Sequence, residues 1–163
     1  MTSRLELRHA YPEPPERMAE VLVDPDYLQA KLREVGGSGA ELVSRTERNG
    51  KVTVVLRQSV PTDSLPSFVR SLAPVDLRIE RTEIWDGTRG RTHAVIGGAP
   101  GTISGTMSLD PDGAGSALGA RIEADVPVPL VGGKVEKVIT DNIGKLMQVE
   151  YTFTLDWLRG RPA

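Results

Sequence analysis

The C-terminal segment, residues 133–158, constrains the fold of this chain more than any other feature. Its apolar side chains recur three and four residues apart, which is the spacing of one face of an α-helix. The stripe comprises Val135, Val138, Ile139, Ile143, Leu146 and Met147. A helix over the whole segment would be about 39 Å long, enough to cross a domain, and so broad a stripe must lie on another apolar surface.

The end of this segment also fits a strand. From Val149 to Trp157 apolar and polar residues alternate, and Thr152 and Thr154 are residues that favour strands. The helix remains the better interpretation, because the upstream stripe is strong and because Arg159 and Gly160 follow it as signals of a helix C-terminus.

Six segments in the middle of the chain have apolar residues at the period of a β-strand. They are Leu42–Arg48, Lys51–Val60, Leu77–Trp85, Thr92–Ile96, Thr102–Leu109 and Leu118–Val128. Asn49-Gly50, Asp86-Gly87 and Asp112-Gly113 are tight-turn signals, so the strands should be antiparallel neighbours. A short helix is predicted at Leu65–Leu72.

The N-terminal part begins with a strand and continues with two short helices. Arg4–Tyr11 alternates strictly, Pro15 suits the first turn of a helix, and Asp24 is placed to cap a second helix that stops at Gly36. The sequence therefore predicts one α+β domain over residues 1–163. A seven-stranded antiparallel sheet with two short helices would be covered by the long C-terminal helix.

The composition excludes several classes of protein. The absence of cysteine excludes disulfides and thiolate chemistry, and a net charge of -2 gives no electrostatic reason to expect nucleic acid. No apolar run approaches the length of about 18 residues that spans a membrane, and the N-terminus lacks the apolar core of a signal peptide. We therefore expect a cytoplasmic protein without an integral membrane segment.

Two stretches of the sequence are similar to a known superfamily. The first is YPEPPERMAEVLVDPDYLQAKL, in which prolines lead from a strand into a short helix and Asp-Pro begins a second one. The second is VPVPLVGGKVEKVITDNIGKLMQVEYTFTLDWL, in which the last strand passes through Pro-Leu-Val-Gly-Gly-Lys into the long helix. Both resemble the START-like superfamily, also called SRPBCC, and the second resembles one uncharacterised subfamily within it.

This resemblance implies the helix-grip fold, in which an antiparallel sheet surrounds the C-terminal helix. Superfamily members bind lipids, sterols or polyketides, carry hydrophobic metabolites, cyclise polyketides, or act through protein contacts. A shared fold does not decide among these functions.

The candidate polar residues each have a structural alternative. His9 lies on the apolar face of the first strand, where it could contact a ligand or be a satisfied core histidine. Arg81 and Glu83 share a face with Trp85, and they either enter the interior as a pair or lie solvated at its rim. Gly144, in the middle of the predicted helix, either leaves room for a ligand or allows close packing on the sheet.

Other motifs point away from metals and nucleotides. His93 has no acidic residue at ligand spacing, and no HExxH or cysteine pair occurs. The glycine-rich stretch Gly97–Gly105 lacks the Gly-Lys-Ser/Thr ending of a phosphate loop and precedes a strand. We expect no metal site and no other cofactor, and the sequence assigns no catalytic residue.

The leading functional hypothesis is the binding or transport of a small hydrophobic ligand, such as a lipid, isoprenoid or polyketide-like compound, in a cavity between the sheet and the helix. The predicted cavity residues are His9, Tyr11, Gln58, Leu77, Ile79, Arg81, Ile103, Met107, Ile122, Ala124, Val126, Val138, Ile139, Ile143 and Met147. Two alternatives stay open: a cyclase-, dehydratase- or hydrolase-like enzyme using the same cavity, and a module that binds a protein partner. A large apolar void favours binding, convergent titratable groups favour an enzyme, and a filled core favours a protein partner.

Overall fold

A computed structural model describes residues 2–36, 39–60, 66–72, 77–97 and 100–160 of the chain. The strands are β1 (Thr2–Tyr11), β2 (Glu41–Arg48), β3 (Lys51–Val60), β4 (Leu77–Asp86), β5 (Arg89–Gly97), β6 (Thr102–Asp112) and β7 (Gly115–Asp125). The helices are α1 (Pro15–Leu22), α2 (Pro25–Val35), α3 (Ser67–Leu72) and α4 (Gly132–Gly160). This order confirms the predicted α+β architecture.

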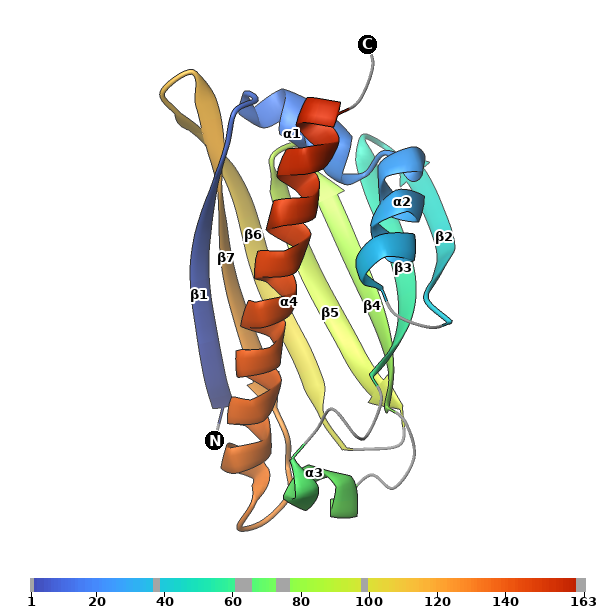
Figure 1. Ribbon diagram of the computed structural model, residues 1–163, viewed down its shortest axis with the longest axis vertical. Helices are drawn as coiled ribbons and strands as arrows, with labels where there is room; N and C mark the ends of the chain where they lie inside the picture. The colour runs from blue at the N-terminus through green and yellow to red at the C-terminus, as the bar shows by residue number, and fades with distance from the viewer. Residues whose placement is uncertain (1, 37–38, 61–65, 73–76, 98–99, 161–163) are drawn as a thin grey trace.

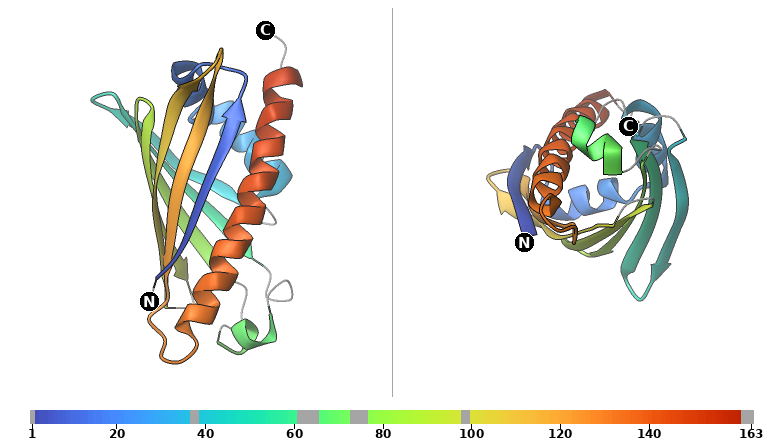
Figure 2. Two further views of the ribbon diagram at one scale, coloured as in Figure 1. Left: turned by 90° about the vertical axis from the view of Figure 1, so that its left-hand side faces the viewer. Right: turned by 90° about the horizontal axis from the view of Figure 1, so that it is seen from below.

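All seven strands form one antiparallel sheet in the order β1-β7-β6-β5-β4-β3-β2. Neighbours from β2 to β7 are consecutive in sequence, whereas β1 pairs with β7 from the far end of the chain. Figure 1 shows α4 running along the sheet, and the right-hand view of Figure 2 shows the sheet curving around it. The concave face of the sheet therefore holds the helices, as in the predicted helix-grip fold.

Local sequence signals explain most element boundaries. Asn49 and Gly50 have φ angles of 54° and 78°, the left-handed conformation that a two-residue hairpin turn requires. The Asp24 side chain accepts a hydrogen bond from the Tyr27 backbone N–H at 3.2 Å and so caps α2. Of the predicted short helix, Ser67–Leu72 is helical, while Leu65 lies outside the described residues.

The last strand is shifted from its predicted limits of Leu118–Val128. Because a two-residue turn follows β6, pairing resumes at Gly115 and includes Tyr11 opposite Ser116. The strand ends at Asp125, since the next backbone N–H, that of Val126, donates to Glu136 Oε2 of α4 at 2.8 Å. A helix carboxylate thus takes over the hydrogen bond that a sheet neighbour would have accepted.

The alternating segment from Val149 to Trp157 is helical, as the C-terminal signals predicted. Its apolar residues lie on more than one side of α4 because this end of the helix has partners on two sides. Tyr151 stacks on His9 of β1, while Phe153 and Trp157 pack against Tyr27 of α2. Neighbours on both sides explain why the local pattern imitates that of a strand.

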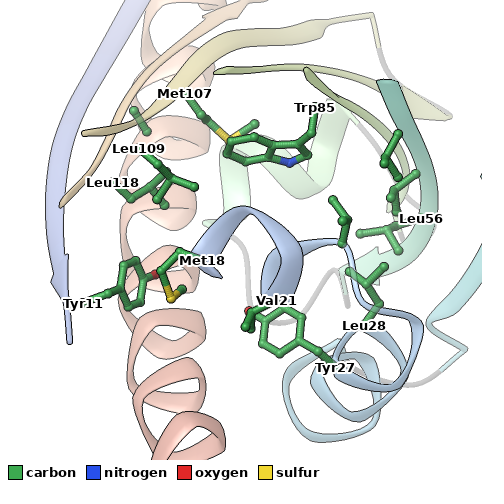
Figure 3. Close-up of a cluster of buried hydrophobic side chains, with 14 of the residues drawn as sticks. Tyr11, Met18, Val21, Tyr27, Leu28, Leu56, Trp85, Met107, Leu109 and Leu118 are labelled. Atoms are coloured by element: carbon green, nitrogen blue, oxygen red, sulfur yellow. The ribbon is translucent and has the colours of Figure 1, made fainter. Parts of the chain in front are cut away.

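Buried side chains form two clusters. The larger one surrounds α1 and includes Met18, Tyr27 and Leu56, whose exposed fractions are at most 1%. Figure 3 shows Met18 and Val21 of α1 pointing among side chains of the sheet and α2. The second cluster joins Ile96 and Ile103 to the N-terminal part of α4.

Gly90 makes room for Trp85 on the concave face. The two residues are opposite each other in β4 and β5, and a Cβ atom on Gly90 would lie 2.9 Å from the indole. Trp85 is 3% exposed, and Figure 3 shows Met107 directed toward its ring. The glycine therefore allows a large aromatic side chain to lie flat against the sheet.

Candidate functional site

A cavity of about 130 Å³ lies between the concave face of the sheet, α2 and α4. It is lined by His9, Tyr11, Leu22, Tyr27, Lys31, Gln58, Ile79, Arg81, Glu83, Trp85, Thr92, Ala94, Ile103, Met107, Leu118, Ile122, Ile143, Leu146, Met147, Glu150, Tyr151 and Thr154. The apolar residues of this lining come from both buried clusters, so the cavity lies where the two clusters meet.

Four charged side chains from three elements line the cavity, and we call them the charged cluster: Lys31, Arg81, Glu83 and Glu150. Lys31 Nζ lies 3.9 Å from Glu150 Oε1, and Arg81 Nη2 lies 3.7 Å from Glu150 Oε2. Arg81 Nε is 3.1 Å from Glu83 Oε2 on the same face of β4. The side chains are between 9% and 18% exposed, so two cations and two anions share a site with little access to water.

The ion pairs do not satisfy all the polar atoms of the charged cluster. Arg81 Nε and Nη2 and Glu150 Oε2 are buried, yet none makes a hydrogen bond to another described group. The 3.7 Å separation of Nη2 and Oε2 exceeds hydrogen-bond length. Because buried donors and acceptors normally find partners, these atoms are suited to a polar group of a bound molecule.

The electrostatic environment keeps Arg81 and Glu83 ionised. Burial alone would raise the pKa of Glu83, but the opposing charges of Arg81 and Lys31 and the Trp85 indole N–H outweigh it, and the pKa is lowered. Burial would lower the pKa of Arg81, but the carboxylates of Glu150 and Glu83 outweigh that effect and raise it.

Tyrosine hydroxyls border the charged cluster. Thr154 Oγ1 donates to the Glu150 carbonyl oxygen at 2.7 Å, so the Tyr27 hydroxyl must be the donor in its own 2.7 Å bond to Thr154. Burial raises the pKa of both Tyr11 and Tyr27 and keeps them neutral. These hydroxyls add polarity at this end of the cavity without adding charge.

His9 forms part of the wall beside β1. Its ring stacks on Tyr151 with centroids 4.3 Å apart, and the Tyr151 hydroxyl donates to the Ala10 carbonyl oxygen at 2.7 Å. Burial lowers the pKa of His9, which favours the neutral imidazole. The aromatic pair connects the edge strand to the C-terminal half of α4.

The other end of the cavity is apolar. Its lining side chains come from β4, β5, β6, β7 and α4, and they are Ile79, Ala94, Ile103, Ile122, Ile143 and Met147. Ile103 and Ile122 are 8% and 3% exposed and belong to the second cluster. The wall of the cavity thus has a charged part and an aliphatic part, which meet where Ala94 lies opposite Arg81 in the sheet.

The structure brings most of the predicted cavity residues together. His9, Tyr11, Gln58, Ile79, Arg81, Ile103, Met107, Ile122, Ile143 and Met147 border the cavity. Val126, Val138 and Ile139 instead belong to the second cluster, and Ala124 is fully buried away from the lining. Leu77 belongs to β4, but its side chain lies outside the described part of the chain. That any of these residues contacts a ligand stays a prediction.

Two questions that the sequence left open have structural answers. Arg81 and Glu83 point inward as a pair, with side chains 16% and 18% exposed, so the solvated alternative is wrong. Gly144 is not among the cavity-lining residues; a Cβ atom there would meet Leu5 of β1 at an ordinary 3.8 Å. The glycine therefore neither widens the cavity nor is required for close packing.

Sequence reasoning missed Lys31 and Glu150 as site residues. Both interrupt apolar stripes: Lys31 follows Tyr27 by one turn of α2, and Glu150 lies between Met147 and Thr154 on the sheet-facing side of α4. A charge inside an apolar stripe was the available signal.

Metal-binding groups and membrane-spanning helices are both absent from the part of the chain that the structure describes. Among the described residues, no three His, Asp or Glu side chains are grouped so that they could hold a metal ion. None of the helices within the described ranges has the length and apolarity needed to cross a bilayer.

The fold is that of START-like proteins. It resembles the ZhuI aromatase/cyclase of Streptomyces sp. R1128, with a TM-score of 0.66, 12% identity, and coverage of 97% of this chain and 96% of that one. A START superfamily protein of Mycobacterium smegmatis has a TM-score of 0.61 at 12% identity, covering 95% and 98%. Norcoclaurine synthase of Thalictrum flavum has a TM-score of 0.64 at 13% sequence identity, with coverage of 95% of this chain and 87% of that one. At such identities the likeness concerns the fold alone.

Within this class, the chain belongs to the family described as "Protein of unknown function (DUF2505)", whose model matches residues 6–158. It is similar to the uncharacterised protein Rv0481c of Mycobacterium tuberculosis, with 32% identity over 149 residues, 87% of this chain and 80% of that protein. The uncharacterised protein Mb0491c of Mycobacterium bovis matches with the same identity and coverage.

Proposed function

We propose that the protein binds a small hydrophobic molecule in the cavity between the sheet and α4. The observation that carries this proposal is the combination, in one cavity, of an aliphatic end and buried polar atoms of Arg81 and Glu150 that lack hydrogen bonds to described groups. Ligand sites are typically apolar with a few polar groups that fix orientation, and this cavity has both parts.

The size of the cavity limits the range of ligands that it could hold. Its 130 Å³ is below the roughly 300–1,000 Å³ of drug-sized sites, whereas an engineered cavity of about 150 Å³ binds benzene. Of the lipid, isoprenoid and polyketide-like compounds expected from the sequence, compact ones fit best. A longer molecule would extend beyond this cavity.

Binding can be tested by filling the cavity. Ile143→Trp introduces an indole at the apolar end, and Val149→Trp, on the same helix but 50% exposed, is the matched control. The readouts are native mass spectrometry for a co-purified molecule and NMR titration with benzene, a single ring of the size that this cavity can hold. We expect wild type and Val149→Trp to bind and Ile143→Trp to lose binding while staying folded.

A different set of results would contradict the binding proposal. A wild-type protein with no co-purified molecule and no benzene binding, together with an Ile143→Trp variant destabilised by the roughly 1–3 kcal/mol typical of overpacking, would mean that this region is ordinary core. The protein-interaction alternative would then replace the binding hypothesis.

One observation favours an enzyme as the second candidate. Several titratable side chains converge on the cavity, and Glu150 Oε2 makes no hydrogen bond to a described group. However, the lowered pKa of Glu83 makes it a poor proton donor near neutral pH, and both carboxylates face cations. A mass change in the bound molecule with wild type, absent with Glu150→Gln, would favour the enzyme.

A further inference from the structure

We infer that the ligand is an uncharged alcohol or phenol of about one ring in size, with its hydroxyl between Arg81 and Glu150. This inference rests on the proposed function and names the chemical class of ligand. Three features support it: the balance of charges around the cavity, the hydrogen-bonding capacity left at the charged cluster, and the cavity volume.

The charges that line the cavity cancel. Among the described lining residues only Lys31, Arg81, Glu83 and Glu150 carry charge, and each cation lies within 4 Å of a carboxylate oxygen. A carboxylate ligand would add an uncompensated negative charge and would compete with Glu150 and Glu83 for Arg81. An ammonium ligand would add an uncompensated positive charge, and both are costly where water has little access.

The other titratable groups facing the cavity do not change this balance. Tyr11 and Tyr27 are neutral because burial raises their pKa, and burial favours the neutral form of His9. The Tyr151 hydroxyl already donates to the Ala10 carbonyl oxygen. A charged ligand therefore finds no counter-charge on the described part of the walls beyond the pairs already formed.

The remaining hydrogen-bonding capacity matches a hydroxyl group. Arg81 offers N–H donors at Nε and Nη2, and Glu150 offers an acceptor at Oε2, with Nη2 and Oε2 3.7 Å apart. A hydroxyl accepts from the guanidinium and donates to the carboxylate at once. A carboxylate or carbonyl only accepts, an ammonium only donates, and a hydrocarbon does neither. Like a bridging water, a hydroxyl can accept one hydrogen bond and donate another, so it could take the place of such a water between these two groups.

The apolar end sets the size of the rest of the molecule. Within 130 Å³ one six-membered ring fits without displacing α4. Ile103, Ile122, Ile143 and Met147 offer aliphatic contacts to such a ring. The ligand thus consists of a compact apolar body and a single hydroxyl.

The test compares four probes with the same ring: benzyl alcohol, benzoate, benzylammonium and toluene. Each is titrated into the full-length wild-type protein at pH 7 by calorimetry and by NMR. We expect benzyl alcohol to bind at least about tenfold more tightly than the other three, since it alone can accept from Arg81 and donate to Glu150 at once. Benzoate, benzylammonium or toluene binding as tightly as the alcohol would overturn the inference.

Charge-changing variants test the balance directly. Glu150→Gln leaves one positive charge in excess and should increase the affinity for benzoate, whereas Lys31→Met leaves one negative charge in excess and should increase the affinity for benzylammonium. Glu80→Gln, on β4 but exposed and paired with Arg57, is the control and should change neither. Both shifts are gains of affinity, for ligands of opposite charge, so a general loss of stability cannot imitate them; if neither occurs, the charge-balance argument is wrong.

The two proposals fail separately. If none of the four probes binds but a molecule co-purifies or benzene binds, the alcohol assignment is wrong and hydrophobic binding stands. If wild type binds nothing by any of these measurements, the proposed function itself fails.

Discussion

Arg81 on β4 and Glu150 on α4 face each other across the cavity, with Nη2 and Oε2 3.7 Å apart. This contact joins the middle of the sheet to the long helix through opposite charges that are mostly buried. Lys31 approaches the same carboxylate from α2, so Glu150 connects three elements. The residue that orients a ligand would therefore also hold the walls of the cavity together.

Removing the Glu150 carboxylate should destabilise the fold strongly. Glu150→Ala leaves Lys31 and Arg81 without their shared anion, and breaking a buried pair in this way typically costs about 3–5 kcal/mol. Glu123→Ala breaks the exposed pair with Arg4 and should cost less than about 1 kcal/mol. Urea unfolding of both variants measures the difference; equal losses would mean that the charged cluster does not hold α4 to the sheet.

Acid should weaken the protein through Glu83. Its pKa in the folded state is below the ordinary 4.5, because Arg81 and Lys31 outweigh the effect of burial. Between the two pKa values the unfolded chain binds more protons, so this stabilisation is complete above pH 4.5 and is lost as the pH falls through the folded-state pKa. Glu83→Gln should thus be less stable than wild type at pH 7, with the gap closing as the pH falls to 3. A stability difference between wild type and Glu83→Gln that stays constant from pH 7 to pH 3 would contradict a lowered pKa of Glu83.

Gly90→Ala should destabilise the concave face. The added methyl group would lie 2.9 Å from the Trp85 indole, which is 3% exposed and cannot easily move. We expect a cost of about 1–3 kcal/mol from overpacking, seen as a lower Tm. In Gly119→Ala the methyl group meets Ser108 Oγ at an ordinary 3.5 Å, so this variant should change stability much less. A Tm for Gly90→Ala equal to that of Gly119→Ala would show that the indole adapts.

The sequence predicted the fold because its signals are local. Asn49-Gly50 sets a hairpin whatever surrounds it, and the stripe from Val135 to Met147 requires a helix with one buried side. The limits of β7 were predicted less well, since its end depends on a hydrogen bond from Val126 to Glu136 of α4. Such a tertiary contact leaves no periodic pattern in the strand.

The site was predictable only in part, because it depends on how α4 and α2 approach the sheet. Alternation placed Ile79 and Arg81 on one face of their strand and nominated them with Ile103 for the cavity wall, but it left open whether the face with Arg81 points inward. It could not show that Ile143 borders the cavity while Val138 and Ile139 do not, because the three share one stripe and pack in the same cluster. Lys31 and Glu150 could not be recognised as site residues from the sequence, because they meet only where α2 and α4, which are distant in the chain, come together.

Gly144→Ala should stabilise the protein. Glycine within a helix costs about 1 kcal/mol relative to alanine, because it loses more backbone freedom on folding. The new methyl group would lie 3.8 Å from both Cδ atoms of Leu5, which is ordinary contact distance and adds a favourable apolar contact. We expect an increase in unfolding free energy of about 0.5–1 kcal/mol in urea, with unchanged affinity for benzyl alcohol. Because Gly144 does not line the cavity, a variant that loses stability or affinity would mean that α4 lies closer to β1, or nearer the ligand, than this structure has it.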